Sequence, residues 1–150
     1  MTLAAAHAMK ALALGSLVVG GCAYRADSFE HAQRPFDGVY LTVDCLDLAI
    51  EHRQRRRASV IEYHFGNRCD QPALVDLAAA RVYEQAADGS ATALVAYDPK
   101  GEIRPGRIDA RAVGREAIEY PRSRADRNLC IDVASIARAR PARWVCFYRD

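Results

Sequence analysis

The sequence predicts an all-β protein, a single antiparallel β-sandwich of seven to nine short strands with at most one short helix. Three observations lead to this prediction. Apolar and polar residues alternate along most segments, which is the pattern of a strand with one buried face. Turn-forming residues recur about every 8–12 residues, as they do between the strands of a sandwich. No segment carries the spacing of a long amphipathic helix, which disfavours a parallel α/β sheet.

The first half of the domain is expected to be a set of short strands around one charged turn. Segment 39–50 alternates with a one-residue slip near Cys45, which predicts two short strands separated by a bulge or a bend. The charged segment 52–57 follows, and segment 59–67 then alternates again. A strand, a polar turn and a second strand predict a β-hairpin whose tip is the charged segment.

The second half is expected to continue with strands and turns. Strands are expected at residues 73–85, 93–97, 116–120, 129–133 and 143–148. Turn residues separate them at 67–72, 87–90 and 98–102 and at Pro105-Gly106. The alanines of 73–85 also permit a helix, but the alternation favours a strand. Residues 132–139 are expected to turn into the one short helix.

The predicted sandwich resembles the immunoglobulin-like domains of exported bacterial proteins, in architecture only. The Cys…Trp…Cys order of antibody domains is absent, because Trp144 follows three of the four cysteines of the domain. The resemblance implies two packed antiparallel sheets and no particular activity.

The N-terminal segment 9–22, MKALALGSLVVGGC, has the layout of a secretory signal. A basic start at Lys10 precedes an apolar run and small residues before a cysteine. The apolar run 11–21 is shorter than the ~20 residues that a transmembrane helix needs. The tetrapeptide Val19-Gly20-Gly21-Cys22 resembles the lipobox of bacterial lipoproteins. This resemblance implies that the Cys22 thiol is acylated and becomes the mature N-terminus, and that a following Ala, in place of Asp, directs the protein to the outer membrane.

This interpretation divides the chain into three parts. Residues 1–21 are expected to be a signal peptide, of which residues 1–8 look like an extension from a start site placed too early. Residues 22–36 are expected to be a lipidated tether, since they lack periodicity and end close to Pro35. Residues 37–150 are expected to form the sandwich as one domain.

Four cysteines follow the lipobox: Cys45, Cys69, Cys130 and Cys146. An even number in an exported chain predicts disulfides, and no two are spaced CxxC as in a zinc ribbon. We expect Cys130–Cys146, because each lies at the centre of a predicted strand, and Cys45–Cys69, because these cysteines flank the first hairpin. The rival pairing, Cys45–Cys130 with Cys69–Cys146, would tie distant strands across the sandwich.

The sequence HRQRRR at residues 52–57 is the sharpest cluster of charge. Guanidinium groups bind phosphate in bidentate fashion, so the cluster could contact an anion, lipid phosphates or an acidic partner. The residues concerned are Arg53, Arg55, Arg56 and Arg57. The plainer interpretation, which we favour, is a solvated hairpin tip whose charges discourage edge pairing.

No other pattern indicates chemistry. His64, Asn67, Cys69 and Asp70 lie close in sequence, but Cys69 is expected to be bonded, which leaves no nucleophilic thiol. Asp98 with Glu102 could supply only part of a calcium site, and we favour a turn in which Asp98 bonds its own backbone. No GxSxG, P-loop or dinucleotide motif is present. We therefore expect no catalytic residue, metal or cofactor, and lean against an enzyme.

The expected function is that of a lipid-anchored envelope protein with a binding or structural role. Removal of residues 1–21 takes away one of 21 basic residues and none of 19 acidic ones, so the mature domain is near neutral and carries no footprint for nucleic acid. The expected partners are the membrane, through the lipid, and a protein of the envelope. The alternatives are a subunit of an envelope assembly or secretion complex, and a hydrolase with an unrecognised active site. The expected location is the outer membrane, facing the periplasm or the cell surface.

Overall fold

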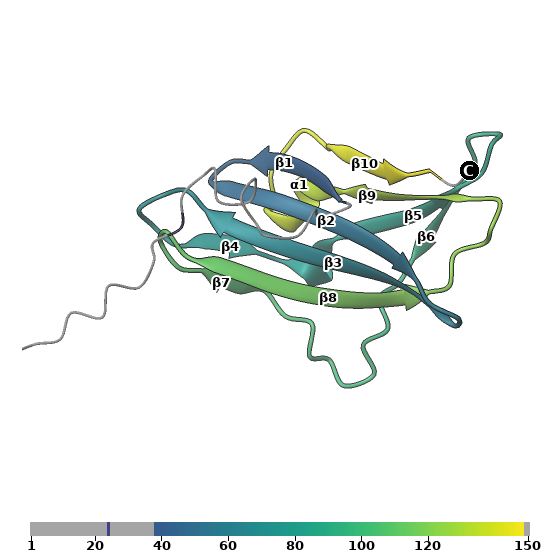
Figure 1. Ribbon diagram of the computed structural model, residues 1–150, viewed down its shortest axis with the longest axis horizontal. Helices are drawn as coiled ribbons and strands as arrows, with labels where there is room; N and C mark the ends of the chain where they lie inside the picture. The colour runs from purple at the N-terminus through teal and green to yellow at the C-terminus, as the bar shows by residue number, and fades with distance from the viewer. Residues whose placement is uncertain (1–23, 25–37, 149–150) are drawn as a thin grey trace, which may run out of the picture.

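The computed structural model describes Tyr24 and residues 38–148, which form an open antiparallel β-sandwich (Figure 1). The first sheet has the order β1 (Val39–Val43), β2 (Leu46–Gln54), β3 (Ala58–Asn67) and β8 (Val113–Pro121). The second has the order β10 (Trp144–Phe147), β9 (Asn128–Asp132), β5 (Arg81–Gln85) and β6 (Ala91–Leu94). A small sheet pairs β4 (Ala73–Val75) with β7 (Gly106–Ile108). The helical elements of the described residues are the 3₁₀ turn η1 (Leu77–Ala79) and the α-helix α1 (Val133–Ile136), so the all-β prediction is confirmed.

The described residues form ten strands, where seven to nine were expected. The strand predicted over 73–85 is wrong as one element, because η1 separates β4 from β5. Asp76 ends the first strand: its carboxylate accepts the Ala79 backbone N–H at 3.1 Å and caps η1. The turn predicted at Pro105-Gly106 leads directly into β7, which pairs with β4.

The slip near Cys45 is a complete chain reversal. Val43 pairs with Leu46, so Asp44 and Cys45 form a two-residue connection between β1 and β2. Asp44 has a φ of 50°, a left-handed conformation that Asp tolerates better than most residues. The predicted bulge or bend is therefore a tight hairpin, and it brings Cys45 to the end of the first sheet.

The core lies between the two sheets and follows the predicted alternation. Leu48 and Ile50 of β2 lie opposite Phe65 and Tyr63 of β3, and all four are at most 1 % exposed. The second sheet contributes inward-facing residues of β5, β9 and β10, namely Val82, Ile131 and Val145. Each fully buried side chain of this size stabilises the fold by about 1.5–3 kcal/mol, so the core fixes which face of each strand is inside.

Both predicted disulfides are present. Cys130 and Cys146 are direct partners in the register of β9 and β10, with Cα atoms 4.1 Å apart. Cys45 and Cys69 have Cα atoms 5.5 Å apart and close the end of the β2–β3 hairpin. Two disulfides in a small domain are typical of an oxidising compartment, which agrees with an exported protein. None of the described helices has the length and apolar character needed to cross a membrane.

Candidate functional site

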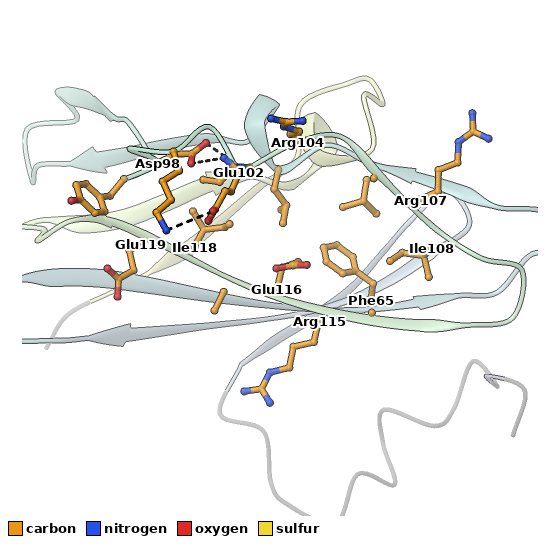
Figure 2. A pocket seen from close by; sticks show the side chains of 18 of the residues that line it. Phe65, Asp98, Glu102, Arg104, Arg107, Ile108, Arg115, Glu116, Ile118 and Glu119 are labelled. Atoms are coloured by element: carbon orange, nitrogen blue, oxygen red, sulfur yellow. Dashed lines mark hydrogen bonds and ion pairs between the residues drawn. The ribbon is translucent and has the colours of Figure 1, made fainter. Parts of the chain in front are cut away.

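A groove of about 610 Å³ runs along the outer edge of β8 (Figure 2). The edge of β8 forms one wall of the groove, and the connection 95–105 between β6 and β7 forms the other. The floor is apolar and comes from β3, β4, η1, β7 and β8, namely Phe65, Val75, Leu77, Ile108 and Ile118. The groove therefore opens directly onto one side of the core.

Hydrogen bonds hold the connection 95–105 in place. The Tyr97 backbone N–H donates to the Glu119 carbonyl at 2.7 Å, which ties the connection to β8. The two carboxylate oxygens of Asp98 accept the backbone N–H groups of Glu102 and Ile103, at 2.8 and 3.0 Å. The prediction that Asp98 bonds its own backbone is confirmed, and this turn gives the groove a fixed outer wall.

Glu116 is one of the four carboxylates that line the groove, and its side chain projects into it (Figure 2). It lies opposite Tyr63 in the register, on the core-facing side of β8, while its neighbour Arg115 points away from the groove (Figure 2). Glu116 is exposed and makes no hydrogen bond or ion pair with the described residues. Arg104 and Arg107 line the same groove. The groove thus combines an apolar floor with a rim of mixed charge, which carries the unpaired Glu116, the carboxylates of Asp98, Glu102 and Glu119, and the cations of Lys100, Arg104 and Arg107.

The outer edge of β8 also presents backbone groups. β8 pairs with β3 alone, and the carbonyl of Glu119 faces outward because it accepts from Tyr97. Backbone direction alternates along a strand, so the N–H and C=O groups of Arg115 and Ala117 also face outward. Apart from the contact at Glu119, this stretch of edge has no strand beside it in the described part of the chain.

The opposite face of the first sheet carries a buried acid. Glu62 is 5 % exposed and accepts from Arg115 Nη2 at 2.7 Å, with Arg53 Nη1 at 3.4 Å. The hydrogen bond from Arg115 holds the pKa of Glu62 below its usual value, against the opposing effect of burial. His64 lies beside it, and partial burial, followed by the charge of Arg115, lowers the pKa of that imidazole. His64 is on the solvent side of β3, as the alternation indicates, but its side chain is only partly exposed there.

The four arginines of the predicted anion site lie at one end of the β2–β3 hairpin. Arg53 is in β2 and contacts Glu51 at 2.8 Å as well as Glu62, while Arg55 contacts Glu119 at 3.3 Å. Arg56 and Arg57 are exposed at the tip. The hairpin prediction is confirmed, and two of its four arginines are engaged within the domain.

The residues around Cys69 have structural roles. Cys69 is in a disulfide, and Asp70 accepts from Arg111 Nε at 2.8 Å. Asn67 is fully buried: its Nδ2 donates to the carbonyls of Gln71, Ile108 and Asp109 at 2.7–3.0 Å, and its Oδ1 accepts the Cys69 N–H at 2.9 Å. In Tyr24 and residues 38–148, no three His, Cys, Asp or Glu side chains gather as metal ligands would.

Lipidation at Cys22 lies outside the described residues, but Tyr24 does not. Tyr24 is 4 % exposed, and its hydroxyl donates to Asp47 Oδ2 at 2.8 Å. Its backbone N–H donates to the Arg111 carbonyl at 2.6 Å. Sequence reasoning missed this contact. The one signal that could have suggested it is Gly66 within a strand, which marks a place where another group approaches closely.

The protein is a disulfide-bonded all-β sandwich with a groove at the edge of one sheet. No protein-family model matches the chain, and no curated protein matches it. Among solved structures, the yjhA protein from Bacillus subtilis is similar, with a TM-score of 0.48 and 8 % identity over 67 % of this chain and 82 % of that one. A likeness this weak says nothing about ligand or activity.

Proposed function

We propose that the protein is a lipid-anchored envelope protein with a binding role, and that the groove along β8 is its binding site. The observation that carries the proposal is Glu116, an unpaired carboxylate above an apolar floor. Ligand sites typically measure about 300–1,000 Å³ and place a few polar groups over an apolar lining. The groove, at about 610 Å³, has this size and an apolar floor, and its rim is more highly charged than that of a typical ligand site.

The chemistry of the groove selects the kind of ligand. A cationic group can pair with Glu116, while an apolar group next to it lies against the part-exposed side chains of Ile103 and Ile108. A partner protein of the envelope that presents a Lys or Arg beside an apolar side chain fits this arrangement. The membrane anchor is supported by the lipobox resemblance at Cys22, and export by the two disulfides.

Capture of partners from the native envelope tests the binding site. We expect Glu116→Lys to lose a partner that the wild-type lipidated protein retains, because the substitution reverses the charge in the groove. Asp126→Lys is the matched control, since Asp126 is exposed and lies outside the groove lining. Equal capture by wild type and both variants would show that the groove is not the binding site.

A subunit of an envelope assembly is the second candidate, and the outer edge of β8 favours it. A partner strand could add to the outward N–H and C=O groups of Arg115 and Ala117. Ala117→Pro removes one outward N–H without touching the bonds to β3, so it should block strand addition and leave the fold intact. If Ala117→Pro abolishes capture and Glu116→Lys does not, the edge binds the partner and the groove does not.

A further inference from the structure

We infer that Tyr24 docks the predicted lipid-bearing N-terminus onto one end of the first sheet, so that this end faces the membrane and the arginine hairpin tip faces away from it. The membrane part of this inference rests on the proposed lipid anchor at Cys22. The docking of Tyr24 rests on contacts within the domain, and the two parts can be tested apart.

The contacts of Tyr24 involve its ring, its hydroxyl and its backbone. The ring is buried, the hydroxyl donates to Asp47, and the backbone N–H donates to Arg111. Asp47 in turn accepts from Thr42 Oγ1 at 2.7 Å and lies 3.2 Å from Arg68 Nε. Because Asp47 is held by β1 and by the turn after β3, the acceptor for Tyr24 is fixed before docking.

Gly66 creates the space for the ring. A Cβ atom at this position would lie 2.0 Å from Tyr24 Cζ and 2.4 Å from both Cε atoms. The Tyr24 ring therefore lies directly on the backbone of β3, where any side chain would collide with it. A slot that matches the ring in shape and supplies a hydroxyl acceptor indicates a specific docking position.

The length of chain between Tyr24 and Cys22 sets the position of the lipid. Cys22 is two residues from Tyr24 in the sequence, and two residues span at most about 7 Å, so a lipid on Cys22 would be tethered within that reach of the docked Tyr24. The arginine tip lies at the other end of β3, nine residues away in the sequence. At about 3.3 Å per residue, this separation is about 30 Å. Figure 1 shows the two ends of β3 at opposite ends of the molecule, with the tip of the β2–β3 hairpin at one of them.

In the proposed orientation β3 stands along the membrane normal, and a tip about 30 Å from the anchor then does not meet the phosphates of the leaflet that holds the lipid. Of the partners considered for the arginines, this orientation leaves an acidic partner and excludes lipid phosphates. The surface that faces the lipids is the end with the Cys45–Cys69 disulfide and the turn 109–112, next to Tyr24. The arginine tip is then presented to the space beyond the membrane.

A double-mutant cycle on the full chain in detergent tests the docking alone. Gly66→Ala should lower the Tm by several degrees in the wild-type background and much less in Tyr24→Ala, because the collision requires the Tyr24 ring. Gly114→Ala is the control: its Cβ would meet Ile108 Cδ1 at 2.4 Å, away from Tyr24, so its effect should be the same in both backgrounds. Equal effects of Gly66→Ala in both backgrounds would overturn the docking.

Fluorescence quenching in vesicles tests the orientation. The lipidated full chain carrying Trp144→Phe receives a single Trp, as Ala110→Trp beside the docking slot or Arg56→Trp at the arginine tip. In phosphatidylethanolamine and phosphatidylglycerol vesicles with brominated acyl chains, we expect strong quenching at position 110 and none at 56. Equal quenching at both, or quenching at 56 alone, would overturn the orientation. If the wild-type chain does not bind vesicles, the anchor and the orientation both fail, while the cycle still decides the docking.

Discussion

Glu62 lies 2.7 Å from Arg115 Nη2 on the outer face of the first sheet, yet Glu62 is 5 % exposed. The carboxylate is removed from water and depends on its cations, which come from β2 and β8 on either side of it. When a buried anion loses a cationic partner, much of the free-energy cost of removing the anion from water is no longer offset. The pair therefore links two neighbouring strands to β3 more firmly than a solvent-exposed ion pair would.

Arg115→Met should destabilise the fold by about 1 kcal/mol. Leaving a buried polar group without its hydrogen-bond partner usually costs about 1–3 kcal/mol of stability. We expect the lower end of that range, because Arg53 still contacts Glu62 and most of Arg115 is exposed. Arg107→Met removes the same charge from an exposed position on β7 and should change stability by less than about 0.5 kcal/mol. Urea midpoints at pH 7 measure both. Equal midpoints for the two variants would contradict a stabilising role for the pair.

Acid should destabilise the protein in two steps. The folded-state pKa of His64 is below its usual 6.5, so the folded state resists protonation, and stability is lost as the pH falls through and below 6.5. Glu62 has a pKa below 4.5, so its contribution is present above that pH and is lost below it. Melting curves between pH 8 and pH 3 should show both steps, and His64→Gln should remove the first alone. If the Tm of His64→Gln falls between pH 7 and pH 5 as much as that of the wild type, His64 is not the cause of the first step.

The alternation along each strand made the core predictable, because Ile61, Tyr63 and Phe65 repeat every second residue and all are buried. Cys130–Cys146 followed for the same reason, since both cysteines occupy strand centres. The break at Asp76 was not predictable from the sequence. Apolar residues alternate through Asp76 as they would in a continuous strand, and the capping bond that ends the strand there leaves no mark in that pattern. The groove and the Tyr24 slot were hidden for a different reason: each is built from segments far apart in the chain, whose meeting depends on the path of the connections.

Asn67→Ala should cost at least about 2 kcal/mol of stability. The buried side chain bonds three carbonyls and one N–H that come from two turns and β7, and its loss leaves these part-buried backbone groups without that partner. Asn128→Ala is the control, because Asn128 makes no side-chain hydrogen bond with the described residues. Urea unfolding measures both, and a loss for Asn67→Ala no larger than that for Asn128→Ala would argue against this role.

Removing either disulfide should cost about 3 kcal/mol in the chain-entropy model, because the loops they close have similar lengths of 24 and 16 residues. The double substitutions Cys45→Ser with Cys69→Ser, and Cys130→Ser with Cys146→Ser, test the two bonds separately. Peptide mapping without reduction should recover the Cys45–Cys69 and Cys130–Cys146 peptides from the exported protein. A peptide that joins the Cys69 and Cys146 segments would contradict this connectivity.

Of the four arginines of the hairpin, only Arg53 should contribute measurably to stability. Arg56→Ser with Arg57→Ser should leave stability within about 0.5 kcal/mol per site, since both side chains are exposed at the tip. Arg53→Ser should lower the Tm, because it removes a cation from Glu62, whereas the Arg55 contact with Glu119 joins two exposed side chains and contributes little.

The same variants separate stability from binding. If the tip meets an anionic partner beyond the membrane, Arg56→Ser with Arg57→Ser should weaken binding to a soluble polyanion such as heparin at unchanged Tm. Salt should weaken the wild-type interaction, because exposed charges are screened over about 10 Å at 0.1 M. Arg104→Ser with Arg107→Ser is the matched control for charge, since it also removes two exposed arginines, from the connection 95–105 and from β7. If this control weakens heparin binding as much as the tip variant does, the effect belongs to overall charge and the tip is not a specific site.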